Sequence, residues 1–204
     1  KVGTLCGVDR DKKVIQLAAL FDDDGEEILP QREEPYDYLV LAIGSVSNDF
    51  GIEGVAENCI FLDSLSQAKM FQRRLVNQFI RLNRDLAKNS VDRKLHVVIV
   101  GGGATGVELS AELFKARQLF ATYGLHNVRP EHLQVSLIEA GPSLLPALSE
   151  RISSAVYTEL EELGVNVNLS TMITRAEKNV LITKDGTRFE ADLIVWAAGV
   201  KAPE

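Results

Sequence analysis

Apolar residues in the second half of the chain follow two alternating patterns. Residues 95–100, 133–138 and 165–169 are short segments rich in apolar residues, and such segments predict buried strands. Between these runs, residues 104–121 and 149–163 carry apolar side chains at helical spacing. Strands that alternate with helices through short connections predict a parallel sheet with right-handed crossovers. This half of the chain is therefore expected to be an α/β domain.

The pattern changes again after residue 171. Within residues 172–196, the turn Lys184–Thr187 separates two short strand-like segments, which predicts a β-hairpin. A last apolar run, Leu193–Trp196, predicts one more buried strand, which leads to Gly199.

The first 44 residues carry short strand patterns. The acidic run at residues 22–27 predicts the solvated tip of a hairpin. Residues 39–43 form an apolar run that ends at Gly44, and such a run predicts a fully buried strand. Residues 45–62 have little periodicity and are expected to form a loop.

A long amphipathic helix is predicted at residues 63–88, with Asp63 or Ser64 as its cap. Its arginines favour a solvated face on a packed helix over a membrane-surface role. The polar stretch "KNSVDRK" that follows is typical of a linker. These boundaries divide the chain into residues 1–62, 63–93 and 94–204.

Composition narrows the class of protein. Of 204 residues, 46% are hydrophobic and 25% are charged, which excludes disorder, and the net charge of −7 argues against nucleic-acid binding. Cys6 and Cys59 form no zinc or disulfide pattern. There is no membrane-spanning run and no signal peptide. Because the chain begins without Met and stops just after a strand, we expect an excised, soluble piece of a longer protein.

The clearest motif is "VVIVGGGATGVELSAE", a strand, a glycine-rich turn and the start of a helix. Gly101 permits the tight turn, Gly103 lets a pyrophosphate approach the backbone, and Gly106 lets the helix pack against the strand. The helix N-terminus adds N–H donors and the positive end of a dipole. The motif predicts a dinucleotide-binding site.

An acidic residue at the end of the next strand completes this pattern. Glu139 stands there, 33 residues beyond Gly106, and the extra length is explained by a loop inserted after the helix. A carboxylate at this place accepts the adenosine ribose hydroxyls and repels a 2′-phosphate, so NADH is preferred over NADPH. His126 and His132 lie in the inserted loop and are expected at the surface.

Glu108 follows Gly106 by two residues and is expected in the first turn of the helix. A carboxylate there has two interpretations. It interacts favourably with the helix dipole, or it is a functional group that faces the bound cofactor.

The segments "YDYLVLAIGS", "VVIVGGGATGVELSAEL", "VSLIEAGPSLLP", "ELGVNV" and "ADLIVWAAGV", in this order, resemble the two-dinucleotide flavoprotein reductases. Among these the chain is most similar to the type II NADH dehydrogenases, which are single-subunit NADH:quinone oxidoreductases. The resemblance implies that this chain is a central piece of such an enzyme. It would contain a Rossmann-like NAD-binding domain with a parallel sheet and a β-hairpin, plus a partial β segment of an FAD domain.

The resemblance also implies roles for particular residues. Glu108 is the expected catalytic carboxylate, near the nicotinamide carboxamide and flavin N5. Ala198, Gly199 and Val200 would pass beside the nicotinamide. The expected cofactor-binding residues are Gly101, Gly102, Gly103, Ala104, Thr105, Gly106, Glu139, Ala140, Ala198, Gly199 and Val200, together with Ala42 and Gly44 near FAD.

The implied reaction passes hydride from NADH to FAD and then electrons to a membrane quinone. The full-length protein is expected to be peripheral, at the cytoplasmic side of the inner (plasma) membrane, with a C-terminal membrane-contacting region outside this sequence. This piece alone is expected to be inactive and not to retain FAD. The oligomeric state stays open, and a homodimer is one possibility.

Two alternative functions remain. One is a related sulfide:quinone, ferredoxin or dithiol flavoprotein reductase, and the other is a non-catalytic NAD-sensing module.

Overall fold

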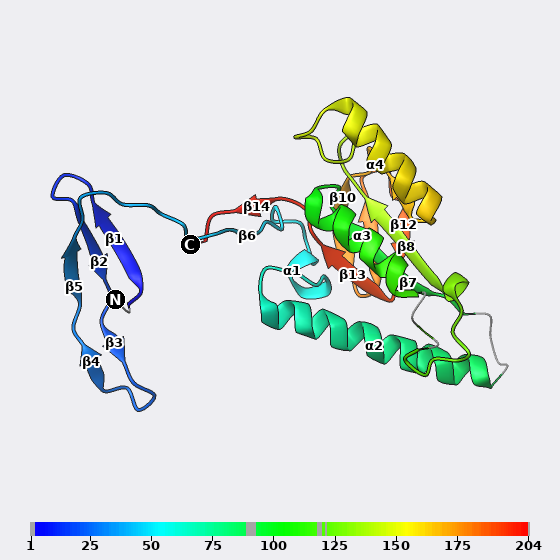
Figure 1. Cartoon of the computed structure of the whole chain (residues 1–204), viewed down its shortest axis with the longest axis horizontal. Coiled ribbons are helices and arrows are strands. Elements are labelled where there is room, and N and C mark those ends of the chain that lie inside the picture. The colour runs from blue at the N-terminus through cyan, green and yellow to red at the C-terminus, as the bar shows by residue number, and fades with distance from the viewer. Residues whose placement is uncertain (1–2, 89–92, 118–119, 121, 204) are drawn as a thin grey trace. The chain divides into compact units, whose positions relative to one another are not determined.

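The computed structural model describes residues 3–88, 93–117, 120 and 122–203 of the chain. These residues fall into two compact units, Lys1–Ile43 and Gly44–Glu204 (Figure 1). Each unit has its own sheets, and each is described by itself below.

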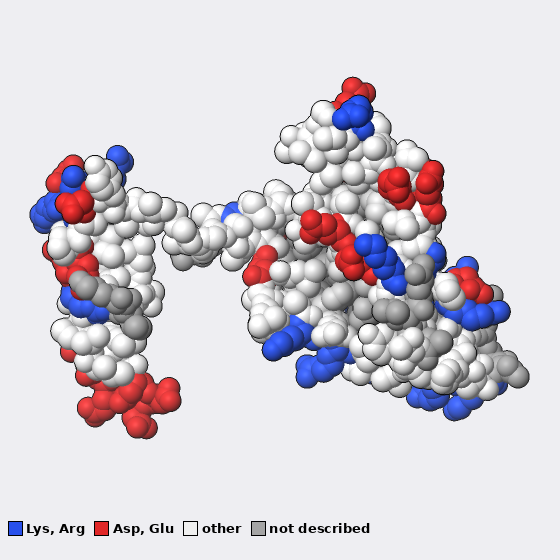
Figure 2. All heavy atoms as spheres, viewed as in Figure 1, with Lys and Arg blue, Asp and Glu red and all other residues white. Residues whose placement is uncertain are grey.

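The first unit is built from short antiparallel strands. β1 (Leu5–Asp9), β2 (Val14–Leu17) and β5 (Arg32–Pro35) form a sheet in the order β1-β2-β5. β3 (Leu20–Phe21) pairs with β4 (Glu27–Leu29) in a hairpin. The acidic residues 22–27 are exposed at its tip, as predicted, and Figure 2 shows them as a cluster of acidic side chains.

The prediction of a buried strand at residues 39–43 is wrong. These residues form no strand, and the side chains of Val40 and Ile43 are 86% and 59% exposed. A buried strand needs neighbouring strands that bond its N–H and C=O groups. No described strand pairs with this segment, so its apolar composition alone does not produce one.

A parallel sheet lies at the centre of the second unit. Its order is β13-β7-β8-β9, formed by Leu193–Trp196, Leu95–Val100, Leu133–Ile138 and Asn166–Asn168. The predicted α/β fold is confirmed, and the bounds of β7, β8 and β13 are those predicted. The last residues of the three adjacent strands are in register, since Val100 pairs with both Ile138 and Trp196.

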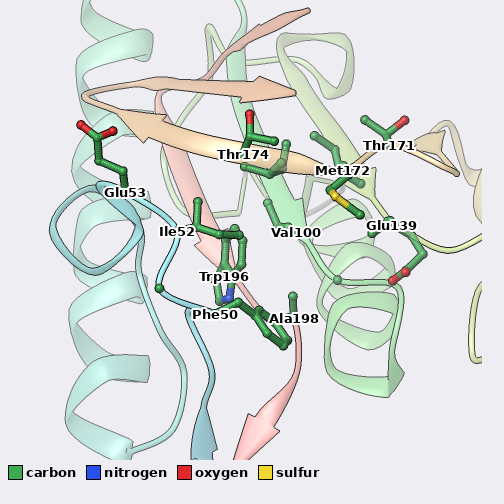
Figure 3. Close-up of a pocket in the computed structure, with 15 residues that line it drawn as sticks. Phe50, Ile52, Glu53, Val100, Glu139, Thr171, Met172, Thr174, Trp196 and Ala198 are labelled. Carbon is green, nitrogen blue, oxygen red and sulfur yellow. The ribbon is translucent and has the colours of Figure 1, made fainter. Parts of the chain in front are cut away.

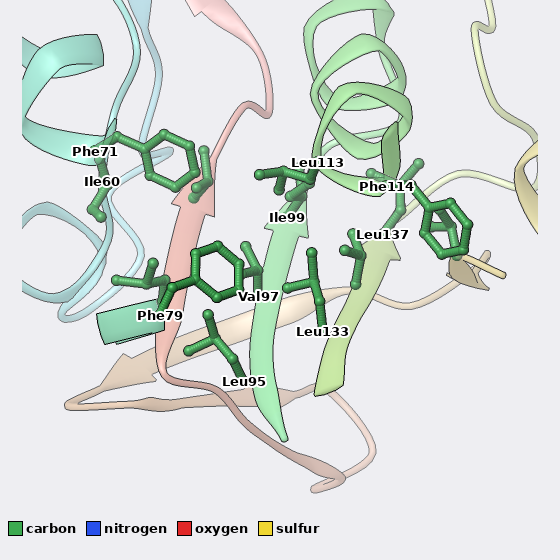
Figure 4. Packing of buried hydrophobic residues seen from close by; sticks show 14 of the residues in the cluster. Ile60, Phe71, Phe79, Leu95, Val97, Ile99, Leu113, Phe114, Leu133 and Leu137 are labelled. Carbon is green, nitrogen blue, oxygen red and sulfur yellow. The ribbon is translucent and has the colours of Figure 1, made fainter. Parts of the chain in front are cut away.

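Helices cover one face of this sheet. α3 (Ala104–Ala116) connects β7 to β8, and α4 (Glu150–Leu163) connects β8 to β9. α2 (Leu65–Ala87) begins at Ser64, whose side chain accepts a hydrogen bond from the Gln67 N–H in a capping box. The apolar cluster under the helices includes Phe71, Phe79, Leu95, Val97, Ile99, Leu113 and Leu137 (Figure 4).

Two further expectations concern the arginines of α2 and the C-terminal end of α3. The arginines of α2 are exposed, as a solvated face requires, and Figure 2 shows basic side chains along this helix. α3 ends at Ala116 rather than near residue 121; residues 118, 119 and 121 lie outside the described residues. No helix in the described ranges has both the length and the apolar composition needed to cross a membrane.

An antiparallel sheet packs on the other face. It consists of β10 (Ile173–Glu177), β11 (Val180–Thr183) and β12 (Arg188–Glu190), in that order. β11 and β12 are the predicted hairpin. Apolar residues of this sheet, including Ile173 and Leu181, form a second core with the alternate side chains of β7, β8 and β13.

Residues 45–62 are more ordered than expected. They contain β6 (Val46–Ser47) and α1 (Val55–Asn58), and Ile60 forms a parallel bridge with Val195 at the edge of the central sheet. β6 pairs with β14 (Val200–Lys201). The expectation of a loop is therefore wrong here, because a one-turn helix and single bridges are too short to leave a periodic pattern in the sequence.

His132 is also placed differently from the expectation. It ends the 3₁₀ turn η2 (Pro130–His132) and is 3% exposed, so it is a buried residue rather than a surface one. Its Nδ1 accepts a 2.9 Å hydrogen bond from the backbone N–H of Arg129. This bond satisfies the ring nitrogen at the start of β8 and explains how a histidine is buried there. His126 is exposed, as expected.

Candidate dinucleotide site

The glycine-rich turn has the backbone geometry that its motif requires. Gly101 has φ +116°, and a Cβ on it would lie 2.6 Å from the carbonyl of Ala197. A Cβ on Gly106 would lie 1.9 Å from the carbonyl oxygen of Gly101. Both positions therefore exclude any side chain, and the second holds the start of α3 directly against the end of β7.

Gly103 differs from the other two glycines. It is the N-cap residue of α3, and a Cβ built on it meets no described atom within 4 Å. Ala104 and Thr105 follow as exposed residues in the first turn. The first N–H groups of a helix have no partners inside the helix and attract anions. The space over Gly103 is thus open to a phosphate group.

Glu139 follows the last residue of β8, and its half-buried carboxylate is fixed by two backbone groups. Oε2 accepts a 2.6 Å hydrogen bond from the N–H of Gly102, and Oε1 accepts one of 2.6 Å from the N–H of Gly141. An ionised carboxylate has about four lone-pair sites. Two sites are left to accept further donors, such as a pair of ribose hydroxyls.

A cavity of about 570 Å³ opens at the carboxyl ends of the central strands (Figure 3). Val100, Ile138 and Trp196, the last residues of β7, β8 and β13, form its floor. β8 and β9 lie on one side of β7, and β13 lies on the other. The end of β7 is therefore a topological switch point of the sheet. In open α/β sheets, ligands bind in the crevice at such a switch point.

The cavity brings together some of the predicted residues and leaves others outside. Gly101, Glu139, Ala140 and Ala198 line it. Val200 lies in β14 and is 71% exposed. Gly44 is exposed and has φ +73°, and Ala42 is exposed in the other unit.

Glu108 was expected in the first turn of the helix after the glycine-rich turn. It is the fifth residue of α3, so it lies at the start of the second turn. Its side chain is exposed, and it is not among the residues that line the cavity. Its carboxylate makes no hydrogen bond or ion pair within the described part of the chain. The carboxylate of Glu108 is therefore free to contact a bound cofactor.

Two cavity walls were not expected from the sequence. Phe50–Glu53 form one wall and Thr171–Thr174 the other. Phe50–Glu53 precede α1, and Thr171–Thr174 include the first two residues of β10. Neither segment carries a motif. The run Asn48-Asp49-Phe50-Gly51, with two turn-forming residues and a glycine, was the one available signal that the chain turns sharply here.

The charged groups of the cavity are sparse. Glu53 pairs with Arg175 at 3.4 Å, so the ion pair stays at the rim, and most of the lining is apolar. Among the described residues, no cluster of three His, Cys, Asp or Glu side chains is arranged to hold a metal ion. The polar side chains of the cavity lining are those of Glu53, Glu139, Thr171 and Thr174, and the rest of the lining is largely apolar.

A parallel sheet with a glycine turn at its switch point and a carboxylate after the next strand defines a dinucleotide-binding domain. Residues 3–204 match the family described as pyridine nucleotide-disulphide oxidoreductase. The chain belongs to this family.

Its relatives by sequence include type II NADH:quinone oxidoreductases. The one from Haemophilus influenzae is 48% identical, over 98% of this chain and 48% of its own length. The one from Staphylococcus aureus is 31% identical, over 95% of this chain and 45% of its own length. An external alternative NADH-ubiquinone oxidoreductase of Yarrowia lipolytica is 30% identical, over 94% of this chain and 34% of its own length. The chain thus spans a third to a half of these relatives.

Solved structures share the fold. NDH2 of Plasmodium falciparum in complex with NADH superposes with a TM-score of 0.73 at 24% identity, over 96% of this chain and 40% of that one. A ferredoxin reductase of Rhodopseudomonas palustris gives a TM-score of 0.66 at 19% identity, over 97% of this chain and 40% of that one. At these identities the likeness establishes the fold, and the predicted fold class is confirmed.

Proposed function

We propose that this chain is the NADH-binding part of a flavin-dependent NADH:quinone oxidoreductase. The observation that carries the proposal is the carboxylate of Glu139, held by Gly102 and Gly141 beside an open glycine turn. The relative from Haemophilus influenzae, at 48% identity, supports the choice of reaction.

The pyrophosphate of NADH binds over Gly101–Gly106. The absent side chain at Gly103 leaves room for it, and the N–H groups of the first turn of α3 would donate hydrogen bonds to its oxygens. Gly102 is bonded to Glu139 and so acts by holding the loop in shape. This open turn at a helix N-terminus supports the proposed position of the pyrophosphate.

The adenosine ribose binds to Glu139, next to Ala140. The two free lone pairs of the carboxylate accept its 2′- and 3′-hydroxyl protons. A 2′-phosphate at the same place would meet a fixed negative charge, so NADH is bound in preference to NADPH.

The nicotinamide lies toward Ala198, Gly199 and Val200. Glu108, exposed on α3, contacts the carboxamide or the flavin ring in the whole protein, which gives its unpartnered carboxylate a role. A bound FAD would accept hydride from NADH and pass the electrons on to a quinone. Ala42 and Gly44 are the residues of this chain proposed to lie near FAD.

We propose that FAD and the quinone also contact parts of the protein outside this sequence, since the relatives are two to three times longer. We propose that the whole protein is peripheral, at the cytoplasmic side of the inner (plasma) membrane, where it would meet a lipid-soluble quinone. We also propose that residues 1–62 belong to the FAD-binding domain, that residues 63–93 connect the domains, and that residues 94–204 form the NADH-binding domain.

The test uses the full-length protein. We expect stoichiometric FAD, calorimetric binding of NADH at least tenfold tighter than that of NADPH, and NADH-dependent reduction of a short-chain ubiquinone analogue. Glu159→Gln, on the exposed side of α4, is a matched control for Glu139→Gln. Reduction of ferredoxin or a disulfide instead of quinone would contradict the reaction, and absent NADH binding would contradict the site.

A further inference from the structure

Phe50 has an unusual backbone conformation. Its φ is +54°, in the left-handed region that is costly for a bulky residue, and Gly51 follows with φ +65°. The Phe50 side chain is nevertheless 59% exposed, so burial does not offset this cost. Strained residues of this kind persist where surrounding structure fixes them, and they concentrate at functional sites.

The fixing groups are visible around Phe50. The side-chain Oδ1 of Asn48 accepts a 2.9 Å hydrogen bond from the Phe50 N–H, and that of Asp49 accepts one of 3.1 Å from the Gly51 N–H. Asn48 is itself held, because its carbonyl accepts a 2.9 Å hydrogen bond from Nε1 of the buried Trp196. The turn is therefore anchored to the end of β13.

The ring of Phe50 covers the backbone of Gly199. A Cβ added to Gly199 would lie 2.3 Å from Cζ of Phe50, so the ring occupies the space that any side chain there would need. Figure 3 shows the ring beside Ala198 and Trp196, on the wall of the cavity. An exposed aromatic face thus stands next to the loop that follows β13.

Phe50 and Glu139 line different parts of the cavity (Figure 3). Trp196 and Ala198 mark the β13 side, whereas Glu139 follows β8, and β7 lies between the two strands. Two strand spacings separate these sides by about 10 Å. A dinucleotide with its adenosine ribose on Glu139 and its pyrophosphate over Gly103 therefore reaches toward Phe50 with its other base.

We propose that the ring of Phe50 contacts the nicotinamide end of bound NADH and sets the orientation of that base. The inference rests on the proposed NADH site and adds a residue to it. The apolar ring contributes van der Waals contact and keeps water from one side of the base. The anchored turn fixes the ring before the nucleotide arrives, so less entropy is lost on binding.

The test compares ligands that contain and lack the nicotinamide, in the full-length protein. By calorimetry, we expect Phe50→Ala to weaken binding of NADH and of reduced nicotinamide mononucleotide about tenfold, a contact energy typical of one aromatic ring. ADP-ribose, which has the adenosine ribose and pyrophosphate but no nicotinamide, should bind within twofold of wild type. Phe50→Tyr, which keeps the ring, should restore NADH affinity.

Two controls separate contact from folding. Tyr123→Ala removes another exposed ring of the same unit, remote from the cavity lining, and should leave all three affinities unchanged. Phe50→Gly relieves the left-handed strain, so its thermal midpoint should rise while NADH affinity falls.

The outcomes are distinct. Equal loss of ADP-ribose and NADH affinity in Phe50→Ala, or unchanged affinity for both, would overturn the role of Phe50. Wild-type protein that binds neither NADH nor ADP-ribose would instead overturn the proposed NADH site itself.

Discussion

The carboxylate of Glu139 and the backbone N–H of Gly102 are joined by a 2.6 Å hydrogen bond across the turn between β7 and α3. A second bond of 2.6 Å ties the same carboxylate to Gly141. Glu139 therefore supports the shape of the glycine-rich turn even without a nucleotide. Its expected role as a ribose acceptor and its structural role share the same oxygen atoms.

Replacement of Glu139 by glutamine should change both affinity and cofactor choice. The amide has one acceptor oxygen, so one of the two N–H groups loses its partner, and hydrogen bonds to charged groups contribute about 1.5–3 kcal/mol. We expect NADH affinity to fall about tenfold, and the preference over NADPH to shrink, measured by calorimetric titration of both nucleotides. An unchanged ratio of the two affinities would refute the assignment of Glu139 to the ribose.

Alanine at two glycines of the same turn should give opposite results. Gly106→Ala places a methyl group in contact with the carbonyl of Gly101, so the free energy of unfolding should fall by about 3 kcal/mol or more. Gly103→Ala meets open space and should cost less than about 1 kcal/mol.

Denaturant unfolding measures the stabilities of these two variants, and nucleotide titration supplies the contrast. Because the new methyl group stands where the pyrophosphate approaches, Gly103→Ala should lose at least about tenfold in NADH affinity while it stays folded. Full affinity in Gly103→Ala would mean that the phosphates lie elsewhere.

His96 should make stability depend on pH. Burial lowers its pKa from the ordinary 6.5, against the opposing effects of its hydrogen bond to the Glu190 carbonyl and of the nearby Asp192 carboxylate. Below about pH 6.5 the unfolded chain therefore binds a proton at His96 that the folded chain resists. The contribution of His96 to the free energy of unfolding is present above that pH and is lost as pH falls through the folded pKa.

His96→Asn keeps a donor near Glu190 and removes this titration. Urea unfolding of both proteins across about pH 5 to 8 should show a shallower acid decline in the variant. The difference between the two curves removes the effect of carboxylates such as Asp185, whose pKa is lowered by its hydrogen bonds to Thr183 and Thr187. Parallel curves would show that His96 does not titrate differently on folding.

Cys59 should resist alkylation in the folded protein. Burial raises the pKa of its thiol to about 12, and the side chain is 9% exposed, so the reactive thiolate is scarce and covered. Mass spectrometry after brief iodoacetamide treatment should find the exposed Cys6 modified and Cys59 intact until denaturant is added. Modification of both at equal rates would mean that the segment around α1 opens readily.

The elements that the sequence predicts well are those buried on both faces. Most residues of β7 and β8 and all residues of β13 are apolar, so the bounds of these strands follow from the pattern. The glycine turn and Glu139 were also predicted, because each position is restricted by backbone geometry or by its place after a strand.

The rest depends on partners far away in the sequence. Residues 39–43 have the composition of a buried strand but pair with no described strand. The conformation of Phe50 depends on Asn48, which is anchored by Trp196 from 148 residues away. The residue type Phe gives no sign of a positive φ, and Glu108 shows that a motif position need not coincide with a cavity wall.

The pairing of β6 with β14 has a consequence for how such proteins are assembled. Ser47 lies opposite Val200 in this antiparallel pair, where facing Cα atoms are about 5 Å apart. The two ends of the segment 46–201 therefore lie side by side. A segment whose ends are adjacent can be inserted into a surface loop of another protein without separating the two sides of that loop. Residues 46–201 are therefore a suitable segment for such an insertion.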